Sequence, residues 1–165
     1  MYSENDISLI IPCYNHQNEL VKLLDYLDKK KIYFGEIIVI DSSKTELELN
    51  EINSLNKIVY IHEQKCLPGK ARNIGIKKST RKILAFLDCN TFPETYWKYE
   101  YIKILNTNII NVILGKCTAV HSNKFNYILK VCSYGGYPFQ CLPGTMILKS
   151  EFEKVGFFDE NSRAG

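Results

Sequence analysis

Four short, almost purely apolar runs divide the N-terminal half of the chain, and they limit its fold more than any other feature does. They are Ser8 to Pro12 (SLIIP), Glu36 to Ile40 (EIIVI), Ile58 to Ile61 (IVYI) and Ile83 to Leu87 (ILAFL). Runs this short, rich in Ile and without polar alternation, are typical of strands buried on both faces of a parallel sheet. We therefore predict four such strands in this order.

Segments with helical periodicity lie between these runs. Gln17 to Lys30 carries leucines at helical spacing among charged residues, Lys70 to Ser79 has a similar pattern, and a third amphipathic helix follows Pro93. We also expect a weak helix near Thr45 to Ser54. Because repeats of strand and helix imply right-handed crossovers, the predicted fold class is α/β, a three-layer, mostly parallel, doubly wound sheet of Rossmann-like type.

The C-terminal third is less regular. The sequence there predicts a strand at VILG (112–115), a strand at Thr145 to Lys149 and a short helix from Ser150. Three aromatic residues in this part are equally suited to stacking on a sugar and to packing beneath a loop: Tyr134, Tyr137 and Phe139.

Composition excludes several classes of protein. With 165 residues, 45% hydrophobic and 24% charged, the chain resembles a single globular domain and not a disordered, collagen-like or coiled-coil protein. The net charge of +3 is too small for a protein held to nucleic acid by phosphate neutralisation, so we expect no nucleic-acid partner.

The six cysteines contain no C-x-x-C pair for zinc. The sequence has no signal-peptide pattern, so we expect a cytoplasmic location and leave attachment to the inner membrane face open.

Polar residues follow the apolar runs where the predicted strands end. Asp41 and Asp88 each end a strand, Tyr14 and Asn15 follow the first strand, and Arg72 lies one turn into a helix. Ligands of doubly wound sheets bind beyond the carboxyl ends of the strands, and an arginine there can donate two hydrogen bonds to a pyrophosphate. The pattern indicates a site for a phosphate-bearing ligand. Taken singly, each Asp is equally explained as a cap, and Arg72 as half of a surface ion pair.

Two common nucleotide-binding motifs are absent. Ala71 stands where a P-loop needs Ser or Thr for magnesium, and Gln64 stands where it needs Gly. The first strand leads into Pro12-Cys13-Tyr14-Asn15 and not into G-x-G-x-x-G, which argues against a dinucleotide site. The same loop lacks the Gly-rich, basic sequence expected of a sugar-phosphate nucleotidyltransferase.

Five ordered motifs together resemble the nucleotide-binding half of an inverting, family 2 type glycosyltransferase with the GT-A fold. They are SLIIPCYN from Ser8, EIIVIDSS from Glu36, GKARNIGI from Gly69, ILAFLDCNTFP from Ile83, and the pair LPGTMILK and VGFFDE from Leu142 and Val155. The resemblance spans nearly the whole chain. It implies one domain, 1–165, with a nucleotide-binding half at 1–110 and the start of an acceptor-binding half at 111–165.

The resemblance implies that eight residues bind the nucleotide-diphosphate sugar: Pro12, Tyr14, Asn15, Asp41, Ser43, Lys70, Arg72 and Asp88. The first three would border the base and ribose, Asp41 would accept hydrogen bonds from the base, and Arg72 would face the diphosphate. Asp88 and Asn90 occupy the D-x-D position, where family members hold Mg²⁺ or Mn²⁺. The cation or a basic side chain stabilises the charge that grows on the departing diphosphate.

The sequence departs from the family pattern in two places. Asn90 replaces the second carboxylate, and an amide oxygen adds no negative charge, which leaves the dependence on a metal open. The family's general base follows the segment that resembles GFFDE, so we expect it after Gly165 and predict no catalytic residue within this chain. Asp159 and Glu160 are expected to cap a helix or a turn. The chain is thus expected to be truncated at its C-terminus.

Two functions remain as hypotheses. The first is transfer of a sugar from a nucleotide-diphosphate donor to a hydroxyl of a glycan or lipid-linked acceptor with inversion, with peripheral membrane association left open. The second is a non-catalytic nucleotide-sugar binding fragment, or an inactive remnant, which Asn90 and the expected position of the base after Gly165 both favour.

Overall fold

The observed elements follow the order that the apolar runs predict. In the computed structural model, which describes residues 1–48, 54–118 and 139–162, they are η1 (Glu4–Asp6), β1 (Ile7–Cys13), α1 (Gln17–Lys29), β2 (Glu36–Asp41), β3 (Ile58–His62), α2 (Pro68–Lys78), β4 (Ile83–Phe86), α3 (Trp97–Leu105), β5 (Val112–Cys117), β6 (Phe139–Leu148) and α5 (Lys149–Val155). None of the helices among these residues has both the length and the apolar character needed to cross a bilayer.

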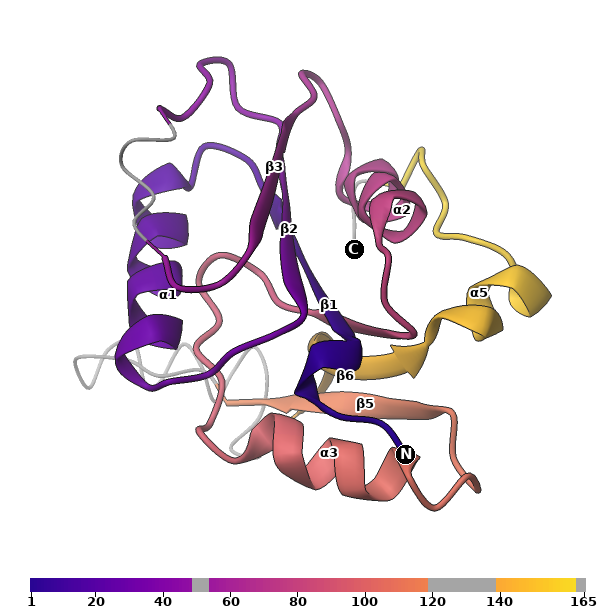
Figure 1. Ribbon diagram of the computed structural model, residues 1–165. Coiled ribbons are helices and arrows are strands. Elements are labelled where there is room, and N and C mark those ends of the chain that lie inside the picture. Colours follow the sequence, from indigo (N-terminus) through magenta and orange to yellow (C-terminus); the bar gives the residue numbers. More distant parts are fainter. Residues whose placement is uncertain (49–53, 119–138, 163–165) are drawn as a thin grey trace.

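A mixed sheet with the strand order β3-β2-β1-β4-β6-β5 forms the centre of the molecule (Figure 1). Strands β3, β2, β1 and β4 run parallel, whereas β6 is antiparallel to both β4 and β5. In β1, Ile10 pairs with Ile38 of β2 on one side and with Phe86 of β4 on the other. The predicted α/β class is confirmed, and the antiparallel edge explains why the C-terminal third lacks a regular alternation of strand and helix.

Helices cover both faces of this sheet and give it three layers. Helices α1 and α3 pack on one face, and α2 and α5 pack on the other (Figure 1). Successive residues of β1 point to opposite faces, so Leu9 joins the core beneath α1 and Ile10 joins the core beneath α2. Full burial of each such side chain stabilises the fold by about 1.5–3 kcal/mol. This two-sided burial is the reason that the runs are apolar without alternation.

The weak helix expected at Thr45 to Ser54 is a wrong prediction for the part of that range that the structure describes. Residues 45–48 and 54 are not helical, and residues 49–53 lie outside the described residues. The Leu47 backbone N–H donates to the Tyr60 hydroxyl oxygen at 3.0 Å. A side chain from β3 thus binds a backbone donor of this non-helical segment.

Strand β6 begins well before the strand expected at Thr145 to Lys149, and Lys149 itself starts α5. The early part of β6 contains Pro143 and Gly144, residue types that sequence patterns place in turns. Gly144 adopts a φ of +85°, which favours glycine. The two tyrosines of the predicted aromatic cluster, Tyr134 and Tyr137, lie outside the described residues, as does the side chain of Phe139.

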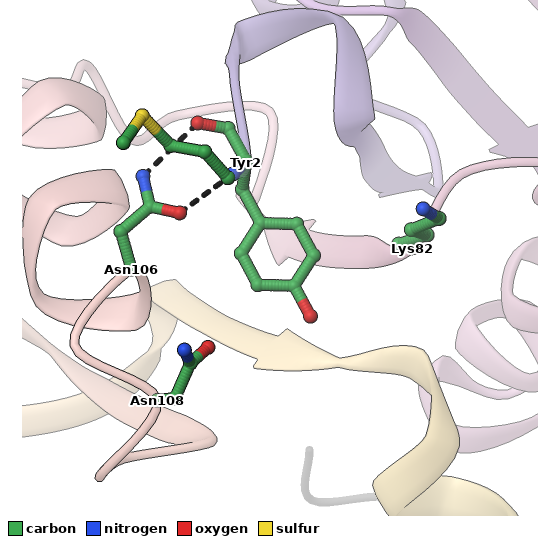
Figure 2. A pocket seen from close by; sticks show the side chains of 5 residues that line it. Tyr2, Lys82, Asn106 and Asn108 are labelled. Atoms are coloured by element: carbon green, nitrogen blue, oxygen red, sulfur yellow. Dashed lines mark hydrogen bonds between the residues drawn. The ribbon is translucent and has the colours of Figure 1, made fainter.

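The N-terminal residues are fastened near the amino end of the parallel strands. Figure 2 shows the Asn106 side chain facing the Tyr2 backbone, where Asn106 Oδ1 accepts the Tyr2 N–H at 2.6 Å and Nδ2 donates to the Tyr2 carbonyl at 3.0 Å. A hollow of about 390 Å³ beside them is also lined by Met1, Lys82 and Asn108. Because the polar groups of Tyr2 and Asn106 bind each other, we assign this hollow a structural role only.

Candidate functional site

The loops that follow β1, β2 and β4 meet at the carboxyl edge of the parallel strands. The Ser42 N–H, just after β2, donates to the Cys13 carbonyl at the end of β1, at 2.8 Å. The Cys89 thiol, just after β4, donates to the Pro12 carbonyl at 3.2 Å. These bonds join the two outer loops to the central strand, so the structure gathers the predicted site residues of all three loops.

Asp41 is the organising residue of the loop after β2. Its side chain is buried, and Oδ1 accepts the Ser43 N–H at 2.9 Å while Oδ2 accepts from Gln17 Nε2 and from the Tyr60 hydroxyl, both at 2.7 Å. Burial raises the pKa of Asp41, but the hydrogen bonds outweigh burial, so the pKa lies below its ordinary value. Burial and the Asp41 carboxylate raise the pKa of Tyr60. Both oxygens of Asp41 are thus engaged within the protein.

Ser43 connects this carboxylate to the turn after β1. Its Oγ accepts the Asn15 N–H at 2.8 Å, and its carbonyl oxygen lies 2.9 Å from His62 Nε2. Asn15 has a φ of 55°, a left-handed conformation that asparagine tolerates better than most residues. The neighbouring Tyr14 is 58% exposed. The turn therefore carries an open aromatic surface at the rim of the site.

Arg72 and Asp88 form the charged centre of the site. Arg72 Nη2 lies 3.1 Å from Asp88 Oδ1, and the arginine side chain is 6% exposed while the aspartate side chain is 40% exposed. Arg72 Nε and Nη1 are buried and have no hydrogen-bond partner among the residues that the structure describes. Leaving a buried charged donor unsatisfied costs free energy of the order of 1–3 kcal/mol. A ligand whose acceptor oxygens reached these nitrogens would remove that cost.

Lys70 lies on the same turn of α2 but faces a different partner. Its Nζ is 3.1 Å from Glu63 Oε1, and the hydrogen bond and charge of Glu63 raise the pKa of Lys70. Both side chains are more than one-third exposed. Lys70 therefore adds positive charge at the rim, outside the ion pair of Arg72 and Asp88.

The donor atoms at Asp88 and Asn90 fit a divalent cation only in part. Asp88 Oδ1 accepts from Arg72, and no described residue donates to Oδ2. Within the described ranges, no three or more His, Cys, Asp or Glu side chains are grouped to hold a metal. Mg²⁺ is commonly bound through one or two carboxylates, with substrate phosphates and water as its other ligands. The donor set therefore fits a cation shared with a phosphate-bearing ligand, not a site complete in protein side chains.

A cavity of about 710 Å³ opens beside Asn90, among the loop after β4, helix α3 and strands β5 and β6. This volume is within the range of small-molecule sites. Trp97 Nε1 donates to the Gly144 carbonyl at 2.8 Å and so fixes one wall. The aromatic and charged members of its lining are Phe92, Trp97, Tyr101, Glu94 and Lys116.

Three residues of the site region were not singled out from the sequence, namely Gln17, Tyr60 and Asn73. Tyr60 was detectable, because a tyrosine in an otherwise aliphatic strand needs a partner for its hydroxyl. Asn73 was detectable as an asparagine inside a helix, where its side chain competes with the backbone unless it has a tertiary partner. Asn73 Nδ2 donates to the Phe158 carbonyl at 2.9 Å and to Glu160 Oε1 at 3.0 Å.

Of the two late carboxylates, Asp159 caps its own turn as predicted, whereas Glu160 does not act as a cap but binds helix α2. Asp159 Oδ1 accepts the Asn161 N–H at 2.9 Å, which is the turn cap expected from the sequence. Glu160 receives its bond from Asn73 of α2. Both carboxylates therefore serve the fold of the 157–161 segment, defined here as the docking turn.

Fold and site together define a class, an α/β domain that presents an ion pair with a buried arginine, an aromatic rim and a cavity at the carboxyl edge of its sheet. The model of the family "Glycosyl transferase family 2" matches residues 8–159, and the chain belongs to this family. A curated relative, the chondroitin synthase of Escherichia coli, is 30% identical over 131 residues. That alignment covers 74% of this chain and 19% of the relative, so the chain spans a small part of the relative's length.

Two solved structures share the fold at low sequence identity. TarS of Staphylococcus aureus in complex with UDP matches with a TM-score of 0.68 at 18% identity, over 97% of this chain and 52% of that one. The mannosyltransferase PcManGT of Pyrobaculum calidifontis, in complex with GDP-Man and Mn²⁺, matches with a TM-score of 0.63 at 14% identity, over 94% of this chain and 48% of that one. The sheet is therefore a GT-A fold, as the sequence motifs implied.

Proposed function

We propose that the protein binds a nucleoside-diphosphate sugar at the carboxyl edge of its sheet and transfers the sugar, with inversion, to a hydroxyl of a glycan or lipid-linked acceptor. The observation that carries this proposal is the Arg72 guanidinium, which pairs with Asp88 and has two further buried nitrogens without a described partner. The oxygens of a diphosphate carry the negative charge that these donors pair with. Family membership and the UDP bound to TarS support the choice of a nucleotide donor.

The reaction requires stabilisation of the diphosphate leaving group. When the acceptor hydroxyl attacks the anomeric carbon, the hydroxyl proton passes to a general base, the bond to the diphosphate breaks and negative charge grows on the phosphate oxygens. Arg72, largely removed from water, stabilises that charge more strongly than an exposed cation does. Asp88 and Asn90 would hold a Mg²⁺ or Mn²⁺ ion, which supplies further charge neutralisation at the same oxygens.

At the other end of the donor, we assign the base and ribose to the turn Pro12, Tyr14 and Asn15. Tyr14 is exposed at the rim and offers a ring on which a base stacks. In this proposal Asp41 and Ser43 serve the donor by holding that turn, because Asp41 is buried and both of its oxygens already accept hydrogen bonds within the protein.

Replacement of Arg72 with Ala tests the proposal. We expect the affinity for the matching nucleoside diphosphate to fall by about 1–3 kcal/mol, or roughly 5- to 150-fold, because charged hydrogen bonds are lost. Calorimetric titration of UDP and of GDP, each with and without Mg²⁺, measures this. The matched control is Lys78→Ala on the exposed side of the same helix. Unchanged affinity in Arg72→Ala would contradict the proposal.

The presence of Asn90 favours a second candidate, a non-catalytic module that binds the donor. A module of this kind binds nucleoside diphosphates but releases none from a donor sugar. Sugar transfer, in contrast, frees UDP from UDP-GlcNAc when an acceptor glycan is added. Measured UDP release above the rate without acceptor would exclude the module, whereas binding without release over a set of glycan acceptors would favour it.

A further inference from the structure

The side chain of Asn73 both donates hydrogen bonds to the docking turn and accepts one from it. Its Oδ1 accepts the Phe158 N–H at 3.0 Å, while its Nδ2 donates to the Phe158 carbonyl at 2.9 Å and to Glu160 Oε1 at 3.0 Å. Asn73 is 1% exposed. One buried amide thus forms hydrogen bonds with both the backbone N–H and the backbone carbonyl of Phe158.

One helical turn earlier, Gly69 lets the same segment approach the α2 backbone. A Cβ atom at Gly69 would collide with the Asp159 carbonyl oxygen, and this neighbour is backbone that cannot rotate away. Any side chain at position 69 would therefore push the docking turn off the helix. Gly69 and Asn73 hold the turn by two independent means, close approach and hydrogen bonding.

The held turn places Phe158 next to Arg72. The centre of the Phe158 ring lies 5.9 Å from the guanidinium carbon of Arg72, and the ring packs edge-on against Phe86 of β4 at 5.8 Å between centroids. Phe158 thereby covers part of the buried arginine side chain, which Asp88 also contacts. In such a low-polarity setting the attraction of a cation for an anion is stronger than in water.

We propose that Asn73 is a positioning residue for the diphosphate: by clamping the docking turn, it keeps Phe158 over Arg72 and so holds the guanidinium shielded and oriented beside Asp88. Asn73 itself does not touch the ligand. The inference rests on the proposed function, because it assumes that Arg72 binds the diphosphate. It predicts that loosening the turn weakens binding of the diphosphate and leaves contacts to the base intact.

The test uses two chemically unrelated variants of the whole chain. Asn73→Asp keeps the shape and the acceptor but loses the donor to Phe158 and Glu160, and Gly69→Ala keeps every hydrogen-bonding group but displaces the turn. We expect each to weaken UDP binding about tenfold, comparable to losing one charge-assisted hydrogen bond. Binding of uridine, followed by saturation-transfer NMR, should stay as in the wild type. Lys78→Ala is the control, and circular dichroism verifies folding.

A second readout reports on Arg72 without any nucleotide. Phenylglyoxal modifies accessible arginines, and peptide mass spectrometry gives its rate at Arg72. We expect a rate increase of about fivefold or more in both variants, since shielding of the side chain is lost. If the wild type binds neither UDP nor GDP, the proposed function fails. If the wild type binds and either folded variant matches it in affinity and in the Arg72 rate, the role of Asn73 is refuted.

Discussion

At the scale of single residues, the two ends of β2 show how burial turns a carboxylate into a structural group. Glu36, at the amino end, is 1% exposed, and its Oε1 accepts from Ser8 Oγ at 2.6 Å and from the Thr80 N–H at 2.7 Å. Burial raises the pKa of Glu36, but these hydrogen bonds outweigh burial and lower it. Asp41, at the carboxyl end, is governed by the same balance. Each carboxylate is therefore stable in its ionised form.

The variant Glu36→Gln tests the balance between burial and hydrogen bonding at a carboxylate outside the candidate functional site. Because the folded pKa lies below the ordinary value of 4.5, the ionised group stabilises the fold above that pH, and this contribution is lost as the pH falls through the folded pKa. We expect the variant to lose about 1–3 kcal/mol of unfolding free energy at neutral pH, and its difference from the wild type to narrow at an acidic pH below 4.5. Urea unfolding measures both. An equal difference in unfolding free energy at the two pH values would contradict the role of ionisation. The control is Glu153→Gln, at an exposed position.

At the scale of elements, the antiparallel edge shows what apolar patterning misses. The Gly115 N–H of β5 donates to Thr145 Oγ1 at 2.9 Å, and the Thr145 hydroxyl donates to the Cys141 carbonyl at 3.1 Å. The register is irregular between Ile113 and Gly115. A side-chain hydroxyl thus takes the place of regular ladder bonds, and β6 continues through Pro143, a residue that sequence rules place in a turn.

Gly115→Ala probes this close approach of β5 and β6. The added Cβ would collide with the Pro143 carbonyl oxygen, so the two strands must separate. We expect a loss of about 1–3 kcal/mol, as is typical of overpacking, and a lower melting temperature by circular dichroism. Lys116→Ala, one residue away and exposed, should melt close to the wild type. Equal melting of the two variants would show that the approach is not tight.

At the scale of the whole molecule, Lys98 joins segments that are far apart in sequence. This α3 side chain is fully buried, its Nζ lies 2.6 Å from Glu4 Oε2 of η1, and it also donates to the Tyr33 carbonyl. The ammonium lies 5.5 Å from the centre of the Phe34 ring. A single cation therefore ties the N-terminus and the loop before β2 to α3.

For this reason, truncation of Lys98 should lower the free energy of unfolding. We expect Lys98→Ala to lower the unfolding free energy by about 3 kcal/mol, near the lower end for a broken buried pair because Glu4 keeps access to water. Lys98→Met should lose less, since it fills the volume. Urea unfolding measures all variants, with the surface-paired Lys103→Ala as control. A loss in Lys98→Ala no larger than in the control would refute the tie.

The sequence by itself determined the four parallel strands, the helices between them and the polar residues at the strand ends. Burial on both faces demands apolar residues at every position of a strand, and a buried helix face demands them at every third or fourth, so these elements leave local patterns that can be read in one dimension. The ordered motifs also predicted the glycosyltransferase family. Residues 45–48, where the sequence predicted a weak helix, are not helical, and the Tyr60 hydroxyl accepts the Leu47 N–H there.

Only the tertiary structure decided which groups are partners. It showed that Gln17 and Tyr60 occupy the Asp41 carboxylate, that Arg72 pairs with Asp88, and that Asn73 holds the docking turn. Each of these bonds joins residues that are 16 to 85 positions apart in the chain. Hydrogen bonds and ion pairs depend on distance and direction to within a fraction of an ångström, and the folded chain sets these quantities only when distant segments pack together.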